Sequence, residues 1–131
     1  MTRSILSAAS LFAAALAAGP GVADTPLDPY LWVARPVIVF ADSDRDPRLA
    51  TQLEEFARAE RELEDRDVVV IIDTDPESAL RTELRPRDFM FVLVGKDGEV
   101  KYRKPRPVPV RELSRVIDKM PMRQQEMRSG S

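Results

Sequence analysis

The sequence predicts an α/β domain in which a four-stranded mixed sheet carries helices on both faces. Three observations lead to this prediction. Residues 36–40 and 67–72 are almost wholly apolar and rich in β-branched side chains, as strands buried on both faces of a sheet are. Each of these runs ends in an acidic turn with an Asp-Pro step, which favours the start of a helix. A third apolar run, 89–94, is followed by a tight hairpin signal, Gly95-Lys96-Asp97-Gly98.

The elements follow in the order β-α-β-α-β-β-α. After the strand at 36–40, a helix is expected from Asp46-Pro47, with one apolar face made by Leu49, Leu53, Phe56, Ala59 and Leu63. A short helix is expected at 77–84, and a more polar edge strand at 99–103. A last helix would bury Val110, Leu113, Val116, Ile117 and Met120. The first two strands would be parallel through a right-handed crossover, and the hairpin would add two antiparallel strands.

The amino terminus predicts export. Residues 1–23 have the pattern of a signal peptide, with a positive Arg3, an apolar run at 5–18, and small residues before a cleavage point after Ala23. An uncleaved anchor is not favoured, because a spanning helix needs ~17–25 apolar residues. We therefore expect a periplasmic or secreted protein without a stable membrane anchor after cleavage. Residues 24–34 would form an arm, 35–121 the domain, and 122–131 a flexible, charged tail.

Composition excludes several kinds of chemistry. The chain contains no cysteine and no histidine, so thiol chemistry, imidazole acid-base catalysis and zinc sites built from these side chains are excluded. Its formal net charge is −2 with both signs interspersed, which argues against nucleic-acid binding. We expect no cofactor. Any catalysis would depend on carboxylates, hydroxyls, lysines or backbone amides.

Three stretches carry a resemblance to a known family. Residues 32–41 (WVARPVIVFA) are similar to the opening of a peroxiredoxin-like domain of unknown function, residues 94–98 (VGKDG) to its hairpin, and residues 117–123 (IDKMPMR) to its closing signature. The resemblance covers about residues 30–127. That family is found in secreted bacterial proteins, and related domains occur in vertebrate extracellular proteins with sushi repeats or coiled-coil labels. It belongs to the thioredoxin-like superfamily, so the resemblance implies a thioredoxin-like fold.

The resemblance also indicates where a redox site would lie. Thioredoxins and peroxiredoxins carry their reactive cysteine just after the first strand, at the amino end of the first helix, where free amides stabilise a thiolate. The matching turn here is Asp42–Asp46, with Ser43 or Asp44 nearest to the cysteine position. The cis-proline of thioredoxins would correspond to Phe89, and Pro86 lies too early. Thiol oxidoreductase and thiol peroxidase activities are therefore excluded.

The candidate site is an acidic edge of the sheet. Because parallel strands end at the same edge, the turn holding Asp42, Asp44 and Asp46 should lie beside Asp73 and Asp75, in the position where open α/β sheets bind ligands. The start of the third strand should bring two arginines there, Arg85 and Arg87.

Three interpretations of this edge remain open. Asp46 and Asp75 would cap helices while the arginines balance the other charges, which explains most of the pattern. Alternatively, Asp42, Asp44 and Asp46 alternate as in a calcium loop, although Pro47 and Leu53 stand where that loop needs glycine and glutamate. A carboxylate acid-base pair with Asp44 beside Ser43 is the third interpretation. No metal site is predicted as the leading interpretation.

A second candidate surface is the aromatic arm. Tyr30 and Trp32 would either cap the core or form an exposed patch for a partner. The leading functional hypothesis is an exported binding module without thiol redox activity, whose partner is an envelope or extracellular protein. Its candidate surface combines the acidic edge with the Tyr30–Trp32 arm. The alternative is a divalent-cation-dependent or carboxylate-based enzyme that uses the Asp42–Asp46 turn.

Overall fold

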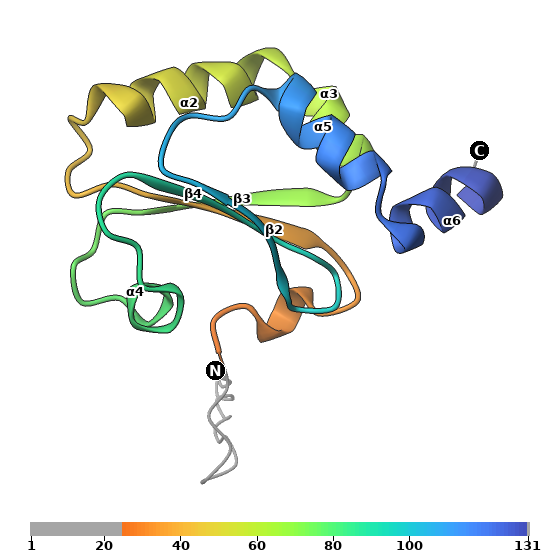
Figure 1. Ribbon diagram of the computed structural model, residues 1–131, viewed down its shortest axis with the longest axis horizontal. Coiled ribbons are helices and arrows are strands. Elements are labelled where there is room, and N and C mark those ends of the chain that lie inside the picture. The colour runs from red at the N-terminus through yellow and green to blue at the C-terminus, as the bar shows by residue number, and fades with distance from the viewer. Residues whose placement is uncertain (1–24, 131) are drawn as a thin grey trace, which may run out of the picture.

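The computed structural model describes residues 25–130, so the expected signal peptide at 1–23 lies outside the described residues. Figure 1 shows a sheet with helices above and below it. In chain order the elements are η2 (Asp28–Tyr30), β2 (Arg35–Phe40), α2 (Pro47–Arg58), α3 (Glu60–Asp65), β3 (Val68–Asp73), α4 (Ala79–Leu84), β4 (Met90–Val94), β5 (Val100–Lys104), α5 (Val110–Asp118) and α6 (Pro121–Gly130).

The sheet confirms the predicted topology. Its four strands lie in the order β3-β2-β4-β5. β2 and β3 are parallel, with Arg35 opposite Val68 and Phe40 opposite Asp73, whereas β2–β4 and β4–β5 are antiparallel. The hairpin also forms as expected, because Gly95 donates a 2.8 Å backbone hydrogen bond to Glu99 and Gly98 takes a φ of +86°.

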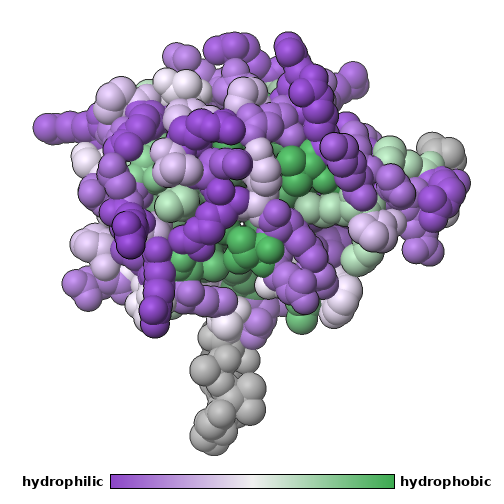
Figure 2. Space-filling view, viewed as in Figure 1, coloured by the Kyte–Doolittle hydropathy of each residue, from purple (hydrophilic) through white to green (hydrophobic). Residues whose placement is uncertain are grey.

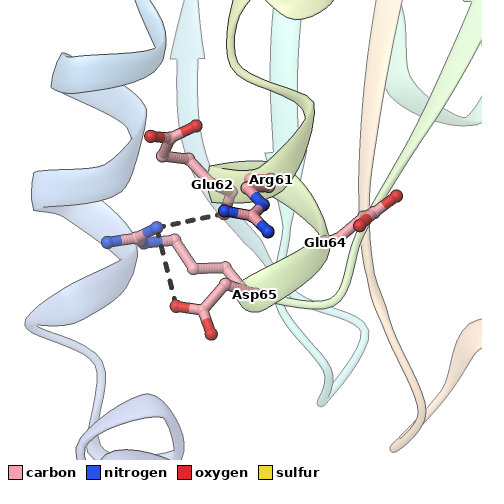
Figure 3. Close-up of a pocket in the computed structure, with 5 residues that line it drawn as sticks. Arg61, Glu62, Glu64 and Asp65 are labelled. Atoms are coloured by element: carbon pink, nitrogen blue, oxygen red, sulfur yellow. Dashed lines mark hydrogen bonds and ion pairs between the residues drawn. The ribbon is translucent and has the colours of Figure 1, made fainter.

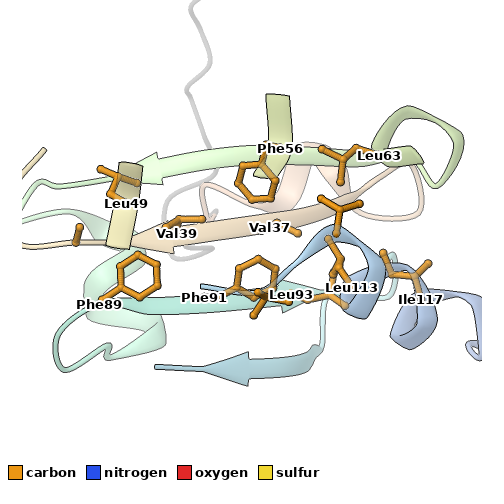
Figure 4. Close-up of a cluster of buried hydrophobic side chains, with 13 residues drawn as sticks. Val37, Val39, Leu49, Phe56, Leu63, Phe89, Phe91, Leu93, Leu113 and Ile117 are labelled. Atoms are coloured by element: carbon orange, nitrogen blue, oxygen red, sulfur yellow. The ribbon is translucent and has the colours of Figure 1, made fainter. Parts of the chain in front are cut away.

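Alternation along the central strands builds a core on each face of the sheet. Val37 and Val39 belong to the core cluster shared with α2, α3 and α5, and Ile38 and Phe40 belong to the cluster shared with α4 and the arm. Figure 1 shows these helices on opposite faces of the sheet. Figure 4 shows the larger core, in which Phe56 of α2 lies 6.5 Å from Phe91 of β4 between ring centroids. The smaller core contains Leu27, Ile38, Phe40, Leu80, Leu84, Val92 and Val94.

The first long helix differs from the expectation of one continuous apolar face. It breaks at Ala59, whose backbone leaves the helical region, and α3 begins at the next residue. Leu53, expected inside, is 42% exposed, whereas Gln52 is fully buried. The Gln52 amide bonds both backbone groups of Val108, at 2.9 Å to its oxygen and 2.7 Å from its nitrogen. Val108 lies between β5 and α5, in the segment 105–109, which contains three prolines and belongs to no strand. Its buried backbone groups therefore need a side-chain partner.

The carboxyl terminus differs from the expected flexible tail. Residues Pro121–Gly130 form helix α6, with Pro121 at its first position. Buried Arg123 donates from its guanidinium to Asp65 and Asp118, at 2.8 and 3.1 Å. Glu126 bonds the buried Arg35. These charged contacts hold a helix that has little apolar surface of its own.

The face of the molecule in Figure 2 is mostly hydrophilic, and its hydrophobic atoms gather in small patches between charged side chains. Within residues 25–130, no helix is both long and apolar enough to cross a bilayer.

Candidate functional site

The turn after β2 starts a helix as the sequence predicted. Asp46 accepts a 2.8 Å hydrogen bond from the backbone amide of Arg48, and Pro47 occupies the first helical position. The hydroxyl of Ser43 accepts from the amide of Arg45 at 3.0 Å, and Asp44 is exposed. The two side chains nearest to the cysteine position therefore lie on an open turn, outside any enclosed pocket.

Arg48 supplies positive charge at this edge. Its guanidinium contacts Asp46 at 2.7 Å and Asp88 at 3.1 Å, and it stacks over the ring of Phe89 at 5.3 Å from the centroid. The hydrogen bonds from Arg48 hold the pKa values of both carboxyl groups below their ordinary range. Asp46 and Asp88 are thus ionised partners of a structural arginine. A carboxylate whose pKa is lowered in this way is a weaker base, so neither is suited to acid-base catalysis.

A second arginine, Arg81 of α4, reaches the other side of the turn. Its guanidinium lies 3.6 Å from Asp42, donates to the carbonyl of Ala41 at 3.1 Å, and stacks over the ring of Phe40 at 5.4 Å. The expected counter-charges were Arg85 and Arg87. Within residues 25–130 neither of these two arginines forms an ion pair. Arg85 is the residue that ends α4, in a left-handed conformation with a φ of +53°.

The acidic turn after β3 has a local structural role. Asp73 is buried and accepts from the amide of Asp75 at 3.0 Å and from the hydroxyl of Ser78 at 2.6 Å. Ser78, and not Asp75 as expected, caps α4 by accepting from the amide of Arg81 at 3.0 Å. Asp75 instead accepts from the amide of Glu77, so this helix starts later than the Asp-Pro step predicted.

Across residues 25–130, no three acidic side chains are grouped closely enough to hold a metal ion. Asp46 is bonded to Arg48 and Asp42 faces Arg81, so the alternating carboxylates do not converge. The edge is a set of separate arginine-carboxylate contacts.

A groove lies at the other end of the sheet, beside the arm. We call it the Trp32 groove, and its lining residues are Trp32, Arg35, Gly95, Lys96, Asp97, Lys101, Val116, Lys119, Met120, Pro121 and Met122. Its volume is about 580 Å³. Most of its surface is contributed by apolar atoms, although lysines stand around it. It combines the amino end of β2, the hairpin and the junction between α5 and α6.

The two aromatic residues of the arm have different positions. Tyr30 packs against the smaller core, whereas Trp32 is 61% exposed at the groove. Trp32 has a φ of +65°, and its amide donates a 2.7 Å hydrogen bond to the carbonyl of Lys96. The hairpin therefore fixes the backbone of Trp32 in a conformation that large side chains rarely adopt.

A buried charge network forms the wall of the groove. Arg35 is 1% exposed, and it donates to both oxygens of Glu126, at 3.2 and 3.0 Å, and to the carbonyl of Arg66 at 2.8 Å. Lys96 bonds Glu126 and Asp67, each at 2.8 Å. Burial acts to raise the pKa of Glu126, but the bonds from Arg35 and Lys96 lower it below its ordinary value.

One atom of this network has no partner. The Nε–H of Arg35 is buried and donates no hydrogen bond within the described part of the chain. An unpaired buried donor is uncommon in native structures and calls for a physical explanation. Sequence reasoning missed this network, because Arg35 and Glu126 are 91 residues apart in the chain and no local pattern pairs them.

The acidic edge and the Trp32 groove do not form one surface. Trp32 precedes β2 and the Asp42–Asp46 turn follows it, so the six residues of the strand separate them by roughly 20 Å. Figure 1 shows the turn at one end of the sheet and α6 at the other. The combined surface expected from the sequence is therefore two separate surfaces.

A third depression lies on α3 and is charged throughout. Figure 3 shows Arg61, Glu62, Glu64 and Asp65 around it, with a guanidinium reaching towards α5. That guanidinium is Arg66, whose bonds to Asp118 at 3.0 and 2.9 Å join the two helices. These contacts of Arg66 are structural.

Comparison with known proteins identifies the family. A family model described as "Domain of unknown function (DUF4174)" matches residues 26–126. The chain belongs to the DUF4174 family. None of the curated protein sequences compared with it matches.

Solved structures show the fold of this DUF4174 domain. The reduced 2-Cys peroxiredoxin of Plasmodium vivax aligns with a TM-score of 0.60 at 14% identity, over 76% of this chain and 84% of that chain. Thioredoxin peroxidase I of Plasmodium yoelii aligns with a TM-score of 0.53 at 16% identity, over 80% and 81%. The DUF4174 domain therefore has a thioredoxin-like fold of the peroxiredoxin kind, and with no cysteine in its sequence it has no thiol chemistry.

Proposed function

We propose that the protein is an exported binding module without redox activity, which holds an envelope or extracellular protein through the Trp32 groove. The observation that carries this proposal is the backbone of Trp32. A left-handed conformation costs an aromatic residue of order 1–3 kcal/mol and persists only where the surrounding structure imposes it. Here the hydrogen bond to Lys96 imposes it and leaves the indole 61% exposed. Exposed, rigidly held tryptophans are typical centres of protein interfaces.

The groove also indicates the chemistry of the partner. Its apolar lining suits an apolar side chain, and about 580 Å³ falls within the roughly 300–1,000 Å³ of ordinary ligand pockets. Lys119 is exposed at the groove and forms no ion pair within residues 25–130. A partner segment with an apolar side chain next to a carboxylate would complement both features.

Export rests on the sequence of residues 1–23, which has the three regions of a signal peptide. Because the signal peptide would direct export, the partner would be met outside the cytoplasm.

Capture from the exported protein fraction tests the proposal with a matched pair of variants. Trp32→Ala removes the indole from the groove. Val33→Ala is the control, because Val33 is 65% exposed on the same arm and does not line the groove. A protein recovered with the parent and with Val33→Ala, but at least tenfold less with Trp32→Ala, is expected. Equal recovery with all three proteins would contradict the proposed surface.

The enzymatic alternative has no comparable support. Asp46 is bonded to Arg48 and Asp42 lies 3.6 Å from Arg81, whereas Asp44 is exposed on an open turn. Across residues 25–130 no acidic side chains converge on a metal position.

A further inference from the structure

One edge of the sheet is unusually open to another strand. β3 is an outer strand, and its residues 68–72 are all valine or isoleucine. It contains no proline, no bulge and no charged side chain over these five positions, and Ile72 is 39% exposed. Exposed apolar edge strands usually carry such protective features, because they otherwise pair with other chains.

The hydrogen bonds to β2 determine which backbone groups of β3 are free. The backbone carbonyl of Asp67 accepts a 2.8 Å hydrogen bond from the amide of Arg35, and that of Asp73 accepts a 3.1 Å bond from the amide of Ala41. In a parallel ladder the bonding residues alternate, so the odd-numbered residues of β3 face β2. The even-numbered residues Val68, Val70 and Ile72 therefore point their N–H and C=O groups away from the sheet.

The opposite edge of the same sheet has the usual protection. Three of the five residues of β5 are basic, namely Lys101, Arg103 and Lys104. The register between β4 and β5 is also irregular at Leu93/Val94. The protein thus protects one edge and leaves the other open, which indicates that β3 has a strand partner.

We propose that the β3 edge binds an extended segment of a partner protein as a fifth strand, with apolar residues in the middle and basic residues at its ends. Such strand addition supplies backbone hydrogen bonds for affinity and side-chain contacts for specificity. The ends of β3 set the charge of the segment. The side chain of Asp67 lies at one end, where it is 49% exposed and also bonds Lys96, and Asp75 is exposed just beyond the other end.

The same charges oppose pairing with a second copy of the chain. The antiparallel register that uses all three outward residues places Val70 opposite Val70 and Val68 opposite Ile72. It also brings Asp67 opposite Asp73 at both ends of the strand pair. Like charges directly opposite each other destabilise a strand pair, whereas basic ends would pair with these carboxylates.

A peptide of defined sequence tests the proposal on the intact protein. The probe is Lys-Thr-Val-Thr-Val-Thr-Lys with blocked termini, and its charge control carries glutamate in place of both lysines. Amide NMR spectra and hydrogen exchange follow each residue of β3. The lysine peptide should bind saturably with a Kd below about 1 mM, a range typical of a weak transient contact. It should slow exchange at Val68, Val70 and Ile72, while Val69 and Ile71 are already protected by β2.

Two variants of the protein make the assignment specific. Val70→Pro removes an outward amide without removing a bond to β2, and Ile72→Lys adds a positive charge to the edge. Each variant should raise the Kd of the lysine peptide at least tenfold. Ile72→Lys keeps the test usable if the proline variant does not fold. No saturable change at β3, or equal binding of the glutamate peptide, would overturn the proposal. So would a dimer in sedimentation whose outward amides are protected without peptide.

Discussion

Replacing Glu126 by glutamine should destabilise the protein more than a helix-surface substitution normally does. Glu126 is 26% exposed on α6, but it neutralises Arg35, which is 1% exposed at the start of the central strand β2. Glutamine keeps the shape and removes the charge. Arg35 then stays buried and cationic, without a neutralising charge from position 126; the carbonyl of Arg66 and one amide oxygen of the glutamine are left as acceptors.

The magnitude follows from the bonds that are lost. Breaking one partner of a fully buried pair costs about 3–5 kcal/mol, because it leaves an uncompensated charge. Glu126 is partly exposed, so we reduce this range and expect about 2–4 kcal/mol for Glu126→Gln. For a domain of this size such a loss lowers the Tm by on the order of 10 °C or more.

A comparison variant separates the charge from the packing. Arg35→Met removes the buried cation together with its unpaired Nε, and Lys96 still neutralises Glu126. Replacement of a buried charge by an apolar side chain is often close to neutral, so this variant should lose less than about 2 kcal/mol. The double variant should be no less stable than Glu126→Gln alone, which gives a coupling energy of about 1–3 kcal/mol.

Urea unfolding followed by circular dichroism measures all four proteins. Equal m-values would show that the same surface unfolds in each. If Glu126→Gln changed the free energy of unfolding by less than about 0.5 kcal/mol, the typical size of a surface effect, the assignment of α6 as an electrostatic clamp would be refuted.

Three other predictions follow from single contacts. Gln52→Leu should cost about 2–4 kcal/mol in urea unfolding, because it leaves both buried backbone groups of Val108 unpaired; a cost below 1 kcal/mol would contradict that role. Asp46→Ala should cost about 1 kcal/mol and Asp46→Asn much less, since asparagine still caps α2; equal losses would show that the cap is unimportant. The pKa of Glu126 is lowered below its ordinary 4.5, so its stabilisation is complete above that pH and is lost as the pH falls through the folded-state value. Acid unfolding of the Glu126→Gln protein should therefore show a weaker pH dependence below pH 4.5, and an unchanged profile would contradict the assignment.

Much of the fold could be predicted because local and global signals agree. The apolar runs that became β2, β3 and β4 have one stable arrangement once a helix connects the first two and a hairpin follows the third. The helix start at Asp46-Pro47 was predictable because capping acts over two residues. The repeat at Asp75-Pro76 gave a wrong helix start, since Ser78 offered a competing cap that bonds buried Asp73.

The candidate surfaces were less predictable because they depend on contacts between distant residues. Sequence alone placed Asp42 and Asp73 at one edge and predicted Arg85 and Arg87 as their counter-charges. It did not indicate that Arg48 and Arg81 would pair with the aspartates of the turn instead. Helix α6 was predicted as a flexible tail because its sequence has no apolar face. Two of the residues that hold it are distant in the chain: Arg35 lies 91 residues from Glu126, and Asp65 lies 58 residues from Arg123.

Fluorescence of Trp32 tests the central claim most directly, because it is the only tryptophan in the chain. The exposed indole should emit at long wavelength in the free protein. Titration with the protein captured by the parent and not by Trp32→Ala should shift the emission to shorter wavelength and saturate, as the indole enters an apolar contact. Saturable binding of that protein with unchanged tryptophan emission would contradict the assignment of the Trp32 groove as the binding site.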